Sequence, residues 1–184
     1  MTAAVRILQP ADWAPPKGYA NGVAARGTTI FVGGQIGWNA RQEFETDDFV
    51  AQAKAALANA VAVLREAGAG PEHVTRMTWY VVDRDEYLGS AKALGAAYRE
   101  VMGRHYPAMT AVAVTALMEA RAKVEIEVTA VVPDCAGGPS PLPAPRKRGE
   151  GPPLAPSRPR SSLSPGRGEG WGEGRGGLER SLLL

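Results

Sequence analysis

Cysteine and histidine are almost absent from this sequence of 184 residues. The chain contains one cysteine, Cys135, and two histidines, His73 and His105. Because a single cysteine cannot form an intramolecular disulfide, we expect a reducing compartment and hence a cytoplasmic location. Neither histidine has a second ligand at the spacing of metal sites, so we predict no metal. The sequence also lacks a Rossmann fingerprint, a phosphate-binding glycine-rich loop and Ser-His-Asp spacing, and we predict no cofactor.

Long hydrophobic runs are also lacking. No apolar stretch reaches the roughly 20 residues that a helix needs to cross a bilayer. The opening segment, MTAAVRILQPADWAPP, contains no apolar run of the length found in a signal peptide. We therefore expect a soluble protein with no membrane partner.

The chain has no strong excess of charge of one sign. Its formal net charge of +2 is an average over two unlike segments. Residues 1–133 carry 13 Lys and Arg against 14 Asp and Glu, which gives −1, whereas residues 134–184 carry 8 against 5, which gives +3. A folded part without a basic excess argues against nucleic acid as a partner.

Residues 134–184 differ in composition from the rest of the chain. They hold 11 of the 22 glycines and 9 of the 15 prolines, and RGEG occurs in them twice. Such a segment buries too little apolar surface to offset its ordering entropy. We therefore divide the chain into an α+β domain, residues 1–133, and a Pro/Gly/Arg-rich disordered tail, residues 134–184. The tail is either a read-through extension, which we favour, or a basic arm for RNA or membrane.

Strand and helix patterns alternate within residues 1–133. Four stretches have the β-branched or alternating composition of strands, namely residues 27–37, 74–83, 110–117 and 122–132. Two stretches carry apolar residues at helical spacing, namely residues 47–68 and 85–103. In the first helix, Thr46 is the expected N-cap and Gly68 the expected stop. The second is expected to be one continuous helix that runs through Leu88, Ala91 and Leu94.

This order of elements predicts an α+β fold with two helices packed on one face of a mixed β-sheet. In the last strand, the side chains of Val124, Ile126, Val128 and Ala130 alternate with polar ones and are expected to face the core. The other sheet face would carry Met77 or Thr78, Trp79 or Tyr80, and the mostly apolar residues 111–117. A large apolar face needs a partner, so we infer a homo-oligomer.

Three blocks of the sequence resemble the reactive intermediate deaminase (Rid) family over nearly all of residues 15–133. They are PPKGYANGVAARGTTIFVGGQIGWN, FVAQAKAALANAVAVLREAGAGPEHVTRMTWYVVD and YPAMTAVAVTALMEARAKVEIEVTAVV. The resemblance implies a chorismate mutase-like fold, assembled as a homotrimer with pockets between neighbouring subunits. It also implies hydrolysis of enamines and imines to ammonia and a keto acid.

The resemblance assigns several substrate-binding positions. Tyr19 matches a tyrosine that lines the pocket, although it also fits a residue that packs at a strand start. Gly33 and Gly34 match a Ser-Gly turn with glycine in place of the serine; these glycines either let the backbone approach a ligand or form a bulge. Gly95 stands where the family often has an asparagine, so that contact is lost.

The family motif Pro-Ala-Arg-Ser/Thr reads Pro-Ala-Met-Thr here, at residues 107–110. The motif arginine grips a substrate carboxylate, and its loss costs roughly 1.5 to 3 kcal/mol of charged hydrogen bonding. Met109 is then either part of the pocket wall or core filler. Thr110 keeps its motif position, and Ala111 replaces a frequent cysteine, which excludes thiol chemistry.

Three other arginines are alternative carboxylate anchors. They are Arg26, Arg104 and Arg121. A substrate that depends less on a carboxylate is the other possibility.

Glu125 is the predicted catalytic residue. The sequence KVEIEV matches the family's Glu-Ile-Glu strand, whose first glutamate orients water or transfers protons. The competing interpretation is that Glu125 and Glu127 pair with basic side chains across an interface.

Two functions follow from the resemblance. The first is hydrolytic deamination of reactive enamine or imine metabolites, with an altered carboxylate anchor. The alternative is a non-catalytic trimer that binds a small metabolite. Either way, the expected partners are a small molecule and further copies of the chain. Some relatives are described as ribonucleases or translation inhibitors, but the charge of residues 1–133 argues against that role.

Overall fold

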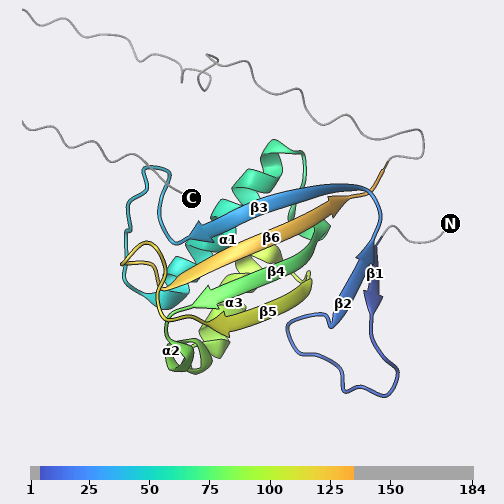
Figure 1. The fold of residues 1–184 in the computed structure, drawn as a ribbon, viewed down its shortest axis with the longest axis horizontal. Coiled ribbons are helices and arrows are strands. Elements are labelled where there is room, and N and C mark those ends of the chain that lie inside the picture. Colours follow the sequence, from blue (N-terminus) through green and yellow to red (C-terminus); the bar gives the residue numbers. More distant parts are fainter. Residues whose placement is uncertain (1–4, 135–184) are drawn as a thin grey trace, which may run out of the picture. The chain divides into compact units, whose positions relative to one another are not determined.

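Residues 5–134 are the part of the chain that the computed structural model describes (Figure 1). Cys135 and almost all of the proposed tail lie outside the described residues. The domain boundary and the disorder of the tail therefore stay predictions. None of the helices in the described part is both long and apolar enough to span a membrane.

The described residues form one mixed four-stranded sheet, one small two-stranded sheet and three α-helices (Figure 1). The elements are β1 (Val5–Leu8), β2 (Gly22–Ala25), β3 (Thr28–Ile36), α1 (Phe49–Glu66), a 3-10 helix (Pro71–His73), β4 (Val74–Val81), α2 (Arg84–Gly89), α3 (Ala91–Met102), β5 (Ala108–Ala113) and β6 (Val124–Val132). The strand order of the main sheet is β3-β6-β4-β5, with β4 and β5 parallel and the other pairs antiparallel. The predicted α+β fold with a mixed sheet is confirmed.

The hydrophobic core lies between this sheet and the helices α1 and α3, which cover the same sheet face, whereas α2 lies next to the ends of β4 and β5 (Figure 1). The alternating residues of β6, from Val124 to Ala130, are buried in it as predicted. From α1, Phe49, Leu57 and Leu64 pack against them. Each such side chain contributes roughly 1.5 to 3 kcal/mol when fully buried.

Gln52 is a fully buried polar residue on α1 that holds the segment just before β6 in place. Its Nε2 donates to the carbonyls of Thr46 and Arg121, both at 3.0 Å, and its Oε1 accepts from the N–H of Lys123 at 2.9 Å. Gly37 gives it space, because a Cβ there would lie 2.5 Å from the Cβ of Gln52. The amide therefore ties α1 to the two segments that flank it in space.

The ends of the helices differ partly from prediction. Asp48, not Thr46, caps α1, because its carboxylate accepts from the N–H of Ala51 at 2.7 Å. Thr46 instead accepts from the N–H of Asp48. The predicted stop is confirmed, since Gly68 follows the end of α1 with φ of 68°.

The second predicted helix is in fact two helices, α2 and α3, and the prediction of one continuous helix is wrong. Ser90 separates them and Asp83 caps α2 with hydrogen bonds from the N–H groups of Asp85 and Glu86. Because α2 is a separate turn, Leu88 is 52% exposed instead of buried.

The uncovered face of the sheet carries Tyr80 and Thr78, the more polar choice in each of the two predicted pairs. Tyr80 pairs in register with Glu125, and Thr78 with Glu127, so all four side chains lie on the face away from the helices. Met77 and Trp79 point under the helices and are buried. The uncovered face is therefore mixed, with carboxylates beside apolar groups, and the homo-oligomer stays a prediction that rests on the family resemblance.

The small sheet of β1 and β2 was not predicted. Its two strands have four residues each, and they pair antiparallel with Val5 opposite Ala25. Strands this short show too little alternation to be recognised in the sequence.

Candidate functional site

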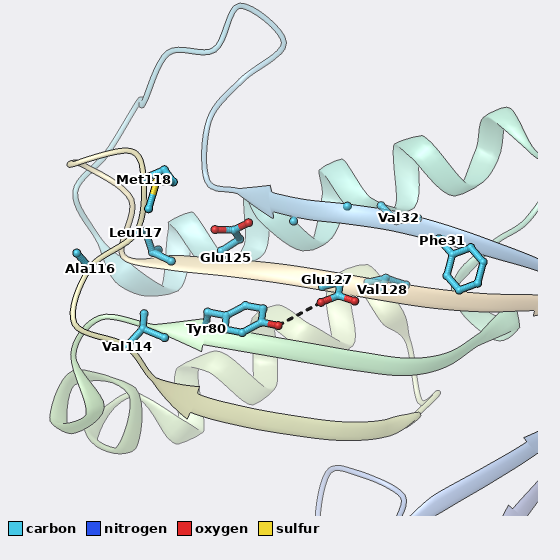
Figure 2. A pocket seen from close by; sticks show the side chains of 12 residues that line it. Phe31, Val32, Tyr80, Val114, Ala116, Leu117, Met118, Glu125, Glu127 and Val128 are labelled. Carbon is cyan, nitrogen blue, oxygen red and sulfur yellow. Dashed lines mark hydrogen bonds between the residues drawn. The ribbon is translucent and has the colours of Figure 1, made fainter. Parts of the chain in front are cut away.

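A cavity of about 460 Å³ lies on the uncovered face of the main sheet (Figure 2). Its floor comes from β3, β6 and β4, and its end wall from the segment that follows β5, including Leu117 and Met118. Three of the predicted site residues line it: Gly33, Gly34 and Glu125. The structure thus brings the predicted acid and the glycine turn together.

Gly34 lies directly against the carboxylate of Glu125. A Cβ on residue 34 would come within 1.7 Å of Glu125 Oε1. At the same place the pairing of β3 with β6 shifts between Val32 and Gln35, as in a β-bulge. Bulges re-aim side chains and backbone beside functional sites. The glycine therefore has a specific role, which is to leave room for this carboxylate.

Glu125 and Glu127 have different surroundings although they share one face of β6. Tyr80 donates a hydrogen bond from its hydroxyl to Glu127 Oε2 at 3.2 Å (Figure 2). This bond, together with burial and the negative charge of Glu127, raises the pKa of Tyr80. Over residues 5–134, no hydrogen bond or ion pair reaches the carboxylate of Glu125. It is therefore available to a water or a substrate in the cavity.

A second cavity, of about 320 Å³, lies on the helix side of the sheet near its β5 edge. Gly95 and Met109, two more of the predicted site residues, line it. Met109 is half-buried, packs against the core and also lines this cavity, and its role in binding a substrate stays a prediction.

The walls of the second cavity are rich in aromatic rings. Tyr98 and Tyr106 stack with a centroid distance of 5.6 Å, and Trp79 contacts Tyr87 edge to face at 6.4 Å. Burial raises the pKa of Tyr87 and of Tyr98, so both phenols stay protonated at neutral pH. The only charged residues of the lining are Lys17 and Arg99.

The remaining predicted residues lie apart from these two groups. Tyr19 is 40% exposed and lines neither cavity, although its neighbours Lys17 and Gly18 line the second. Thr110 is exposed opposite Thr78 on the uncovered face. Ala111 borders a smaller cavity of about 170 Å³ along β5. A single chain therefore does not gather all eight predicted positions in one place.

The three alternative arginines are not in the second cavity. Arg121 is bound to Asp47 at 2.9 Å and to the carbonyl of Phe44, whose ring it also covers. Arg26 and Arg104 line none of the three cavities described here. Arg99, which does, was missed in the sequence; the available signal was its position four residues after Gly95, one helical turn away.

Comparison with known proteins gives one consistent result. The family model described as endoribonuclease L-PSP matches residues 11–132. A RutC family protein of Synechocystis sp. is 30% identical over 135 residues, which cover 70% of this chain and 98% of the relative. Protein DfrA of Myxococcus xanthus is 36% identical over 110 residues, which cover 57% of this chain and 77% of that protein.

Solved structures agree with these sequence matches. A Rid family protein of unknown function, YyfB from Yersinia pestis, superposes with a TM-score of 0.61 at 32% identity, over 70% of this chain and 99% of that one. RidA from Psychrobacter sp. superposes with a TM-score of 0.51 at 27% identity, over 65% of this chain and 92% of that one. Both matches have the length of the described α+β domain.

Proposed function

Because the chain belongs to the Rid family, whose model carries the description endoribonuclease L-PSP, we propose that it hydrolyses reactive imines and enamines to carbonyl compounds and ammonia. Deamination of this kind is a function of the family. The observation that carries the proposal for this chain is the carboxylate of Glu125, which lies unpaired in a cavity against Gly34.

The reaction needs one positioned carboxylate and one water. The carboxylate of Glu125 accepts a proton from water as the oxygen bonds to the imine carbon and the C=N electron pair moves to nitrogen. The nitrogen takes a proton from solvent to give the neutral carbinolamine. Glu125 then gives its proton to that nitrogen, the C–N bond breaks with its electron pair on the departing ammonia, and the hydroxyl proton passes to solvent as the carbonyl forms. The sum is imine plus water giving carbonyl compound plus ammonia. An enamine enters the same route after protonation on carbon.

The complete site is proposed to form between two chains of a homotrimer. Five of the eight predicted residues fall into two groups, with Gly33, Gly34 and Glu125 on the uncovered face and Gly95 and Met109 at the β5 edge on the helix side. Pockets between neighbouring subunits would join the first group of one chain to the second group of the next. This arrangement accounts for two half-sites within one subunit.

The family model's description as an endoribonuclease is not carried over to this chain. The first cavity holds two carboxylates, Glu125 and Glu127, and they would repel a phosphate backbone.

The test is an imine hydrolysis assay with a charge-removing variant. An amino-acid oxidase generates the imine in the assay mixture. The enzymatic rate is the rate of ammonia release minus the rate of spontaneous hydrolysis. Glu125→Gln should lower that rate about 100-fold or more, because the amide cannot exchange protons with water. Glu72→Gln, which removes an exposed carboxylate in the 3-10 helix that precedes β4, is the matched control.

Two outcomes would contradict the proposal. If the parent protein accelerates no imine in a panel with and without carboxylates, the non-catalytic metabolite-binding trimer replaces the enzyme. If Glu125→Gln keeps the parent rate, another group activates the water.

A further inference from the structure

The second cavity is lined by cations that have no counter-ion. Lys17 and Arg99 are its only charged lining residues. Within residues 5–134, neither side chain forms a hydrogen bond or an ion pair. The lining contains no carboxylate, so the cavity carries an excess of positive charge.

The acidic residues of the nearby helices are already paired. Glu100 on α3 binds Lys54, and Glu86 on α2 binds Lys123 at 2.6 Å. A guanidinium beside apolar walls suits an organic anion, because its fork of N–H donors matches the two oxygens of a carboxylate. The cation at Arg99 is therefore suited to a ligand that is not part of the chain.

The guanidinium of Arg99 lies close to Gly95. The two residues are one turn apart on α3, and a Cβ on residue 95 would be 3.4 Å from Arg99 Nη1. The guanidinium thus lies over the bare backbone of Gly95, beside a wall that also contains Met109. A methyl group at position 95 would be in ordinary contact with the guanidinium, whereas a longer side chain would compete with it for the same space.

The rest of the lining is apolar and aromatic. Trp79, Leu94, Tyr98 and Tyr106 form a wall into which a large apolar group can be buried. Position 109, where the family motif has arginine, is a methionine and extends this apolar surface. The volume of about 320 Å³ is at the low end for small-molecule sites.

We propose that Arg99, with Lys17 beside it, binds the carboxylate of the substrate in place of an arginine at position 109. The apolar wall with Met109 then takes the substrate's side chain. The substrates are accordingly imines of amino acids with large apolar, above all aromatic, side chains. This inference rests on the proposed function for the reaction, but the binding step is measurable without turnover.

The test measures the binding of stable ligands to the full chain by calorimetry. Phenylpyruvate is the probe, pyruvate lacks its ring, and 3-phenylpropanamide lacks its charge. We expect phenylpyruvate to bind about ten-fold or more tightly than either of the others. Arg99→Gln should lower the affinity for phenylpyruvate at least about ten-fold and leave the affinity for the neutral amide unchanged. Arg104→Gln, which removes an arginine outside the cavity, should leave all three affinities unchanged.

A second variant guards against an indirect effect of the first. Gly95→Leu places a side chain where the guanidinium lies. It should therefore lower the affinity for phenylpyruvate although Arg99 is still present. Thermal unfolding of both variants checks that the fold is intact, which is expected because Arg99 is exposed on α3.

The outcomes separate this inference from the proposed function. Imine hydrolysis with an unchanged phenylpyruvate affinity in Arg99→Gln would overturn the inference and leave the reaction standing. If phenylpyruvate binding depends on Arg99 but no imine is hydrolysed, the inference stands and the proposed function is overturned. Equal affinities for pyruvate and phenylpyruvate would overturn the assignment of an aromatic side chain.

Discussion

The carboxylate of Glu125 lies against Gly34 and excludes a side chain at position 34. The carboxylate lies where the Cβ of any other residue at position 34 would be. The glycine of the GGQ segment is thereby linked to the acid of β6, on a strand about 90 residues later. The first prediction follows from this contact.

Gly34→Ala should displace the carboxylate of Glu125. Either the side chain of Glu125 rotates away or the backbone of β3 shifts, and overpacking of this kind costs roughly 1 to 3 kcal/mol. We expect imine hydrolysis to fall at least about ten-fold, together with a lower melting temperature. Gly33→Ala is the comparison for stability, because a Cβ there meets no atom within 4 Å. Equal losses of stability in the two variants would show that the contact with Glu125 is not the cause.

Met109→Arg should change which imines are hydrolysed. It adds a bidentate carboxylate donor, so activity on small amino-acid imines such as that of alanine should rise about ten-fold or more. The longer side chain also takes up apolar space, so activity on the phenylalanine imine should rise less or fall. The measurement is the ratio of kcat/KM for the two imines. Adding Glu125→Gln should abolish the gained activity; a gain that survives it would remove Glu125 from the reaction.

The hydrogen bond between Tyr80 and Glu127 should be visible in the titration of the tyrosine. Its pKa is raised first by this bond, then by burial and by the negative charge of Glu127. Glu127→Gln removes the charge, so the pKa of Tyr80 should move down toward its ordinary value. Tyrosine ring carbon shifts in an NMR pH titration give the value, and Tyr80→Phe identifies the signal. An unchanged pKa would mean that the bond is not formed in solution.

Two variants that are each impaired in a different half-site should complement each other if the site lies between subunits. Arg99→Gln keeps Glu125, and Glu125→Gln keeps Arg99. In trimers refolded from an equal mixture, about one quarter of the interfaces combine the two intact half-sites. We therefore expect up to about a quarter of the parent activity on the phenylalanine imine to return. Light scattering must give a trimer mass, since a monomer at micromolar concentration or no recovery would place the whole site within one chain.

The fold was largely predictable because most core residues follow a simple period. The alternation along β6 and the spacing in α1 place their apolar side chains correctly. The helix limits were less predictable, since Thr46 and Asp48 are both good caps and only the geometry selects Asp48. In the same way, Ser90 divides two helices that share a continuous apolar pattern.

The candidate site was predictable only in part. The resemblance identified Glu125, Gly34 and Met109, and the structure places the first two in contact. Which of Trp79 and Tyr80 faces the core depends on the register of β4 against β6, and one residue of shift exchanges them. Arg99 was missed because its importance comes from two other residues, the glycine beneath it and the methionine beside it. No single position in the sequence shows that combination.

The buried amide of Gln52 couples the opening of α1 to the opening of the segment that leads into β6, the strand that carries Glu125. It holds the carbonyls of Thr46 and Arg121 and the N–H of Lys123, which come from two segments far apart in the sequence. Opening either segment breaks bonds that the other also needs, so the two should open as one cooperative unit. In hydrogen-exchange experiments the amide of Lys123, two residues before Glu125, should then exchange only as fast as the first turn of α1 unravels. The alignment of the acid would thus be lost and regained together with the beginning of that helix.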